Sequence, residues 1–334
     1  MSCFCCDYNI VTGYRTINDG RIDICNDCMN LLNGSFSCSR CSNLITINRE
    51  NRHIMGYFKD GKIYCSSCAP IYGIFGITNF THKRGNLNGY CYKPNPIFHP
   101  TTLRSNSNLF LGVELEMGLA RSNQAVGNFC DNHDGKIFYF KTDCSIRSYG
   151  CEVVTHPCTI DYHKSEESGW KQLLEDAESA GFRSGSEANT GIHVHMNRNF
   201  FTDKDLKKID LFVNFYRDLW EKIAGRRNNS YCSYSMKRHN EWGHNNNGRY
   251  SSVNYCNSHT IELRIFNGNI KYNDVMAILE ICHALAIFCK DITFEELYEK
   301  SNDVKSKFKN LLYDRSKYQY AKNFCNNNNI FEGV

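Results

Sequence analysis

Short segments in the second part of the chain alternate apolar and polar residues with the period of a β-strand. Successive side chains of a strand point to opposite faces of a sheet, so this alternation predicts strands with one buried face. Other segments place apolar residues three or four positions apart, as an amphipathic helix does. The pattern predicts strands at 111–117, 137–141, 151–155, 192–197 and 260–266, and helices at 170–180, 203–224, 274–289 and, with a break, 294–312.

The predicted strands and helices do not alternate regularly along the chain, which disfavours a barrel or a doubly wound parallel sheet. An antiparallel sheet with helices packed on one face fits this order better. Thr202, directly before the helix at 203–224, is a typical N-cap residue. We therefore expect an α+β fold for this part of the chain.

Three of the predicted strands carry two polar residues, two positions apart, between apolar neighbours. Such pairs share one face of a strand. Two like charges side by side on a sheet cost free energy unless a cation lies between them. The three strands therefore predict one sheet face lined with charged and titratable side chains, which is our candidate active site. The pairs are Glu114 and Glu116, His193 and His195, and Glu262 and Arg264.

Composition divides the chain into modules. Nine of its 19 cysteines lie in the first 68 residues, and four of its five prolines lie between positions 70 and 100. A stretch rich in Pro, Asn and Gly between regions of different composition is typical of a connector. We predict a cysteine module at 1–69, a linker at 70–107, and a catalytic domain with C-terminal helices at 108–334.

The cysteines of the first module form four pairs, each with two residues between its members. One such pair presents two thiolates to a tetrahedral ion, and a second pair closes the site. We predict two structural Zn²⁺ ions, as in tandem zinc ribbons or LIM-like fingers; scattered free thiols and an iron–sulfur cluster are the alternatives. Cys5 and His53 remain possible substitute ligands. The predicted ligands are Cys3, Cys6, Cys25 and Cys28 for one ion and Cys38, Cys41, Cys65 and Cys68 for the other.

The charge pattern and the cysteines indicate which partners the protein binds and in which cellular compartment it works. The basic residues of the first module are scattered, which favours protein docking over nucleic-acid binding without excluding the latter. The most apolar stretch, 275–289, is shorter than a membrane span and contains Glu280 and His283, so we expect no membrane partner. Many cysteines without an apolar N-terminal signal segment predict a reducing, cytoplasmic environment.

Six motifs of the larger module occur in the order found in one protein family. In this respect the chain resembles the phage-type amidoligases, which belong to the carboxylate–amine ligase superfamily with glutamate–cysteine ligase and glutamine synthetase. The resemblance covers roughly residues 108–290 and leaves out the cysteine module. The motifs are Phe110–Glu116, Lys141–Ser145, Gly150–Pro157, Thr190–His195, Arg249–Asn254 and Thr260–Phe266.

The resemblance implies a sheet that holds ATP with divalent metal ions, an acyl-phosphate intermediate, and attack by an amine to form an amide. Carboxylates suit Mg²⁺, and an arginine can neutralise charge on a transferred phosphoryl group. The implied Mg²⁺ ligands are Glu114, Glu116 and Glu152. The implied catalytic set adds Asp143, Ser145, His193, His195, Glu262 and Arg264 to these three, and the implied ATP-binding set is Arg249, Tyr250, Asn254 and Arg264.

Each group also has an ordinary structural explanation. Glu262 and Arg264 suit an ion pair on the sheet, and Asp143 and Ser145 suit a turn. The two glutamates at 114 and 116 suit a solvated strand face, and the two histidines suit half-exposed strand positions.

Three functions remain open at this point. The leading one is an ATP- and Mg²⁺-dependent ligase that joins a carboxylate to an amine, either of them in a peptide or protein, in the cytoplasm of a cell or of a phage host. The second is a non-enzymatic virion or interaction protein with a ligase-like core. The third is a dinuclear metallohydrolase, because a His-x-His pair can hold two metals.

Overall fold

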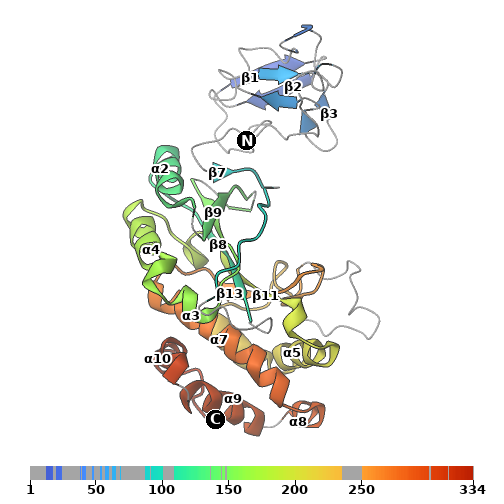
Figure 1. Cartoon of the computed structure of the whole chain (residues 1–334), viewed down its shortest axis with the longest axis vertical. Coiled ribbons are helices and arrows are strands. Elements are labelled where there is room, and N and C mark those ends of the chain that lie inside the picture. Colours follow the sequence, from blue (N-terminus) through green and yellow to red (C-terminus); the bar gives the residue numbers. More distant parts are fainter. Residues whose placement is uncertain are drawn as a thin grey trace.

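A seven-stranded sheet lies at the centre of the chain in the computed structural model (Figure 1). The structure describes residues 87–333 apart from 91, 101–108, 136, 144, 147–148, 235–249, 301 and 315. Before residue 87 it describes only 13–17, 20–24, 38, 40–42, 47–48, 53–54, 57–59, 62–64 and 68. In spatial order the sheet consists of β12 (Val253–Asn254), β13 (Thr260–Asn267), β11 (Gly191–Asn197), β8 (Leu111–Met117), β10 (Cys151–Thr155), β9 (Phe138–Lys141) and β7 (Leu87–Asn88).

All neighbouring strands of this sheet are antiparallel except β7, which is parallel to β9. The expected antiparallel α+β architecture is therefore present in the described part of the larger module. Nearer the N-terminus, three small two-stranded sheets pair β1 (Gly13–Ile17) with β2 (Gly20–Ile24), β3 (Ile47–Asn48) with β4 (His53–Ile54), and β5 (Tyr57–Lys59) with β6 (Lys62–Tyr64).

The helices agree with the predicted ones in part. The predicted helix at 203–224 is two helices, because the backbone leaves helical geometry at Tyr216, where φ is −102° and ψ is 38°. Thr202 caps the first of them in a capping box with Asp205, as a helix start requires. The helices are α2 (Asn123–His133), α3 (Ile160–His163), α4 (Trp170–Ser179), α5 (Asp203–Phe215), α6 (Arg217–Ala224), α7 (Tyr272–Asp291), α8 (Phe294–Tyr298), α9 (Asn302–Asp314) and α10 (Gln319–Asn327).

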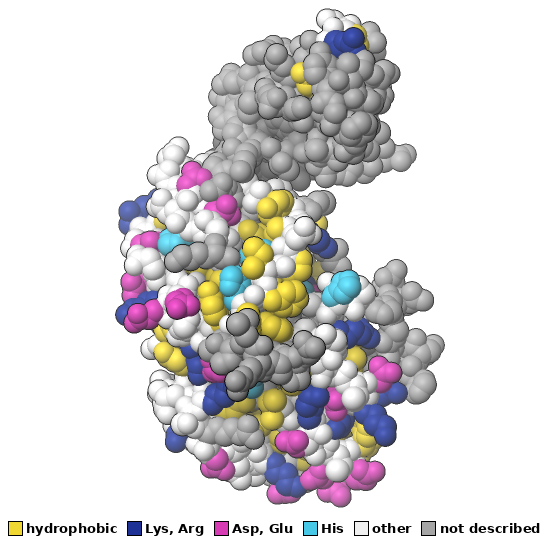
Figure 2. Space-filling model, in the orientation of Figure 1, with side chains coloured by type: hydrophobic (Ala, Val, Ile, Leu, Met, Phe, Trp, Pro, Cys, Tyr) yellow, Lys and Arg dark blue, Asp and Glu magenta, His cyan; other side chains and the backbone are white. Residues whose placement is uncertain are grey.

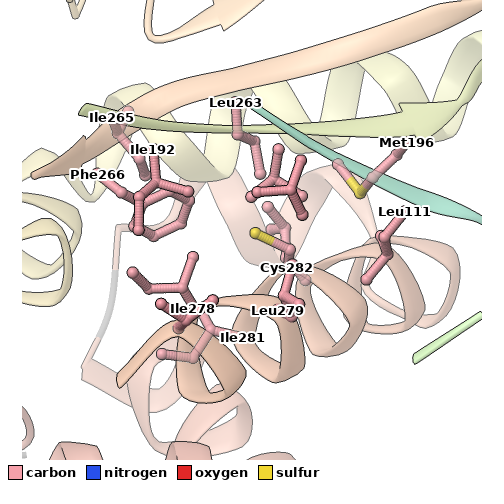
Figure 3. Close-up of a cluster of buried hydrophobic side chains, with 14 of the residues drawn as sticks. Leu111, Ile192, Met196, Leu263, Ile265, Phe266, Ile278, Leu279, Ile281 and Cys282 are labelled. Atoms are coloured by element: carbon pink, nitrogen blue, oxygen red, sulfur yellow. The ribbon is translucent and has the colours of Figure 1, made fainter. Parts of the chain in front are cut away.

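Helix α7 packs against one face of the sheet. Its apolar side chains, among them Ile278 and Cys282, point toward strand residues such as Ile192 and Leu263 (Figure 3). On its other sides α7 packs against α5, α9 and α10, so it is apolar nearly all round. Among the described helices α7 alone is long and apolar enough to cross a membrane, but 78% of that apolar stretch is buried inside the fold.

Part of the predicted linker belongs to the sheet module. Strand β7 lies at residues 87–88, and the segment that follows carries exposed hydrophobic side chains, among them Tyr92, Ile97 and Phe98. Hydrophobic side chains gather in the middle of the face that Figure 2 shows. The ring of Tyr92 lies edge-on to Tyr139 at 5.8 Å, and the ring of Phe98 lies edge-on to Phe110 at 5.0 Å. A boundary between the modules at residue 107 stays a prediction, and a cut there would remove both ring contacts and β7.

A buried histidine joins β8 to α3 and α4. The His163 ring is 0% exposed; its Nδ1 accepts a hydrogen bond from Trp170 Nε1 at 3.0 Å, which leaves Nε2 to donate to the Leu111 carbonyl at 3.0 Å. Burial lowers the pKa of His163 from 6.5 to about 4. Both hydrogen bonds need the neutral ring, because a protonated Nδ1 cannot accept.

We predict that His163 makes the fold sensitive to acid. Its folded pKa lies below its unfolded pKa, so the stabilisation is complete above pH 6.5 and is lost as the pH falls toward 4. The full loss is on the order of 3 kcal/mol. Urea unfolding at pH 7 and pH 5 should show a smaller pH-dependent loss for His163→Phe than for the wild type or the exposed control His259→Gln. Equal losses in all three proteins would contradict this explanation.

Candidate active site

The strand registers place the predicted polar pairs on one face of the sheet, opposite to α7. Glu114 of β8 lies across from His193 of β11, and Glu116 lies across from Glu152 of β10. His195 of β11 lies across from Glu262 of β13. The intervening residues of these strands, such as Val113 and Leu263, are buried in the core. One face is thus apolar and packed, and the other carries the charged groups.

Glu114 is the centre of this face. Its Oε2 lies 3.3 Å from His193 Nδ1, and its Oε1 lies 3.5 Å from His195 Nε2. The Glu114 side chain is 23% exposed, so solvent reaches it, whereas that of His193 is only 6% exposed. His195 is held from behind by Thr260, whose Oγ1 lies 3.1 Å from His195 Nδ1.

The pKa values of these groups depend on one another. Burial would raise the pKa of Glu114, but the charges and hydrogen bonds of His195 and His193 hold it well below its usual value. Burial would lower the pKa of His195, but Glu114, with Glu262 and Glu152, raises it to about 9. His195 is therefore protonated at neutral pH, and its positive charge balances part of the negative charge of the neighbouring carboxylates.

Glu262 is fixed from two sides. Its Oε2 accepts a hydrogen bond from Asn254 Nδ2 at 2.7 Å, and its Oε1 forms an ion pair with Arg264. Asn254 Oδ1 accepts from the backbone N–H of Cys256 at 2.9 Å. Both ends of the Asn254 amide are thus engaged within the protein, so here Asn254 orients Glu262. The ion pair expected as the ordinary explanation of Glu262 and Arg264 is present, but it lies inside the polar cluster.

Glu116 lies beside the start of β11. Its Oε2 accepts a hydrogen bond from the Gly191 N–H at 2.8 Å. Burial raises the pKa of Glu116, an effect that nearby His193 and this hydrogen bond oppose and that Asp143 reinforces. The pKa of Glu116 is therefore shifted in the direction opposite to that of Glu114.

Lys141, which is not among the predicted site residues, completes the cluster on the β9 side. Lys141 Nζ lies 2.8 Å from Glu152 Oε2, and both side chains are less than 10% exposed. Burial and the charge of Glu114 raise the pKa of Glu152 to about 8, against the opposing effect of Lys141. Tyr139 lies on the same strand face, and burial raises its pKa to about 12. Tyr139 and Lys141 form an i,i+2 pair of the kind already recognised on three other strands, so the sequence held the signal.

The remaining predicted residues lie at the border of the cluster. Asp143 Oδ1 accepts from the Ser145 N–H at 2.6 Å, which is the turn expected as their ordinary explanation, and Ser145 is exposed. Asp143 still acts electrostatically on Glu116 and Glu152. The Arg264 guanidinium lies 5.9 Å from the centre of the half-exposed Tyr250 ring. The predicted ATP-binding residue Arg249 lies outside the described residues.

Two overlapping groups of side chains on this face have the geometry to hold a cation. In each group the ligand atoms lie within 4.8 Å of one another. Glu114 belongs to both, so its carboxylate stands between them. Carboxylate oxygens suit Mg²⁺, and the imidazoles also suit Mn²⁺ or Zn²⁺. The groups are Glu114, Glu152 and His193, and Glu114, His195 and Glu262.

In the N-terminal module the thiols of Cys38, Cys41 and Cys68 also lie within 4.8 Å of one another. These are three of the four ligands predicted for the second zinc ion, and three thiolates so close together fit the donor set of a structural zinc site. The other predicted ligands, Cys3, Cys6, Cys25, Cys28 and Cys65, lie outside the described residues, so the two zinc ions stay a prediction.

Comparison with known proteins adds little. No protein-family model matches the chain, and no curated protein matches it by sequence. Among solved structures, the complex between the prokaryotic ubiquitin-like protein Pup and its ligase PafA is similar with 11% sequence identity and a TM-score of 0.27. That similarity covers 54% of this chain and 46% of the other, less than half of its length. A TM-score this low says nothing about activity, and the resemblance to the amidoligases stays a prediction from the motifs.

We predict that Lys141 is needed because Glu152 is buried. At pH 9, where Glu152 with its pKa of about 8 is ionised in the wild type, Lys141→Met removes one partner of a buried ion pair and should lower the free energy of unfolding by roughly 3–5 kcal/mol. The double variant Lys141→Met/Glu152→Gln removes the uncompensated charge and should recover much of this loss. Urea unfolding with EDTA present measures both, so that no cation replaces the ammonium group. A double variant no more stable than the single one would contradict the prediction.

Proposed function

We propose that this protein is an ATP- and Mg²⁺-dependent ligase that forms an amide between a carboxylate and an amine through an acyl phosphate. The observation that carries the proposal is the position of Glu114. Its two oxygens face different histidines, and it belongs to both groups that could hold a cation on this sheet face. The order of the six sequence motifs supports the same chemistry.

Carboxyl groups outnumber permanent cations on this face, and a divalent cation would displace the protons that His195 and Glu152 hold without it. Four carboxylates, those of Glu114, Glu116, Glu152 and Glu262, stand against two permanent cations, Lys141 and Arg264, and the ion pairs of these two leave Glu114 to the histidines. Like charges in a partly buried site are stabilised by a cation between them. Mg²⁺ bound by some of these carboxylates would hold and neutralise the phosphate groups of ATP.

The protein groups would serve two steps. In the first, an oxygen of the substrate carboxylate attacks the terminal phosphorus of ATP and ADP leaves. In the second, the amine nitrogen attacks the acyl carbon, phosphate leaves, and the nitrogen gives up a proton. Arg264 would counter the charge on the transferred phosphoryl group. Cations bound by the carboxylates would lower the pKa of His195, and its neutral ring would then accept the proton of the amine.

The substrates and the compartment form part of the proposal. The carboxylate, the amine or both would belong to a peptide or protein, and the zinc module would dock the macromolecular partner. The cytoplasm, that of the host in the case of a phage protein, would supply ATP and keep the cysteines reduced.

A second candidate, a dinuclear metallohydrolase, is favoured by the sharing of Glu114 between two donor groups. The two functions differ in their need for nucleotide. A hydrolase would use a metal-bound water and would not bind ATP more tightly when Mg²⁺ is added.

We predict that ATP binding requires Mg²⁺ and that Glu114→Gln weakens it most. Glu114 belongs to both donor groups, whereas Glu116 belongs to neither and already accepts from Gly191, so Glu116→Gln should have a smaller effect. Loss of a shared ligand should weaken binding by roughly tenfold or more. Calorimetric titration with ATP, with and without Mg²⁺, measures this, and Glu178→Gln on the exposed face of α4 is the control. Equal affinity with and without Mg²⁺ would rule out the ligase.

We predict two zinc ions per chain, in protein purified without a chelator. Cys38→Ser should reduce the content to one, because Cys38 is one of the three converging thiols. Cys256→Ser, in the sheet module, should leave it at two. Metal analysis by mass spectrometry distinguishes these values. A wild type with well under two zinc ions would contradict the tandem-site prediction.

A further inference from the structure

The guanidinium of Arg226 fills the space above Gly191. A Cβ atom at position 191 would lie only 3.0 Å from Nη1 of Arg226, 3.3 Å from the Phe266 carbonyl oxygen and 3.5 Å from Nε2 of His193. The backbone N–H of Gly191 meanwhile donates to Glu116. Gly191 and His193 are two positions apart on β11, so the guanidinium lies on the charged face of the sheet. It thus stands beside an imidazole and a carboxylate, in a place that glycine leaves open to it.

Arg226 reaches this space from outside the sheet. It follows Gly225, the residue that ends α6 with a positive φ of 59°. Among the described residues no carboxylate lies within 4.0 Å of its guanidinium, and its hydrogen bond from Nη2 to Asn229 Oδ1 is long at 3.5 Å. A half-buried arginine without a carboxylate partner retains its capacity to bind an anion.

Arg226 and Arg264 act on the same region. Burial raises the pKa of the Cys232 thiol to about 11, and the positive charges of both arginines oppose this rise. Arg264 also has a buried Nε with no hydrogen-bond partner in the described chain. One guanidinium lies on β13, where it is paired with Glu262, and the other comes from the C-terminal end of α6. Together they border the carboxylate face on its β13 side.

We propose that Arg226, held over Gly191, binds the terminal phosphoryl group of ATP beside the charged face of the sheet, a subsite that rests on the proposed function. A phosphoryl oxygen suits this place because it can accept from a guanidinium and at the same time share a cation with nearby carboxylates. A free carboxylate brings less charge and would face Glu116 without such a bridge. Arg226 would then hold the group that Arg264 neutralises, and Gly191 is needed because a Cβ would displace the guanidinium.

Matched variants test the subsite, since the chain provides an adjacent arginine. Arg227 is exposed and has the same charge, so Arg227→Gln controls for the loss of one positive charge. Calorimetric titrations of the full chain with Mg²⁺·ATP and Mg²⁺·ADP, at a fixed ionic strength of about 0.15 M, compare the two variants with the wild type. Thermal unfolding without nucleotide checks that both variants fold as the wild type does.

Arg226→Gln should weaken Mg²⁺·ATP binding about tenfold or more relative to Arg227→Gln, because a charge-assisted hydrogen bond is lost. It should weaken Mg²⁺·ADP binding much less, because ADP lacks the terminal group. Arg226→Lys should fall between Arg226→Gln and the wild type, and Gly191→Ala should reproduce part of the ATP-specific loss. A purely structural role of Arg226 would not produce this difference between ATP and ADP.

Two results would overturn the subsite alone: equal effects of Arg226→Gln and Arg227→Gln, or equal losses for ATP and ADP. In both cases a wild type that binds Mg²⁺·ATP would leave the proposed ligase intact. A wild type that binds no nucleotide would overturn the ligase and the subsite together.

Discussion

The sheet depends on balancing the negative charge that four glutamates place on one of its faces. Each carboxylate is partly or wholly buried, and a different partner group offsets the free-energy cost of burying each one. Glu152 has Lys141, Glu262 has Arg264 and Asn254, and Glu116 has a backbone N–H. Glu114 has only the two histidines beside it, and the pKa of one of them, His195, is raised to about 9. A divalent cation bound at Glu114 would replace the proton of His195 as the partner of this carboxylate. The proposed activity rests on that exchange.

The opposite face of the sheet makes such a cluster possible. Side chains of β8, β11 and β13 pack onto α7, which is itself enclosed by α5, α9 and α10. Apolar burial on that side is what holds the strands in register, and the register in turn fixes which polar side chains meet. A slip of one residue would move Glu114 and His193 into the core. The charged face is therefore as precisely placed as the hydrophobic packing beneath it.

We expect the N-terminal module and the sheet module to rest on different kinds of stabilisation. The sheet module has a large apolar core, whereas a cysteine module of about 69 residues is too short to build a core of that size. Metal ligation is the usual substitute in units of this size. The convergence of Cys38, Cys41 and Cys68 agrees with that expectation.

The sequence by itself determined the five main strands, the faces of their side chains and the antiparallel α+β class, because period-two patterning and apolar content are local properties. It could not determine that Tyr216 divides one helix into two or that β7 and β12 extend the sheet, since such short elements depend on their neighbours. Glu152 and Asn254 were found through motifs, but only the strand registers showed which carboxylates each of them meets. The period-two pair of Tyr139 and Lys141 is visible in the sequence, but only the tertiary structure showed that Lys141 pairs with Glu152. Arg226 required the tertiary structure altogether, because it and Gly191 come together from separate elements.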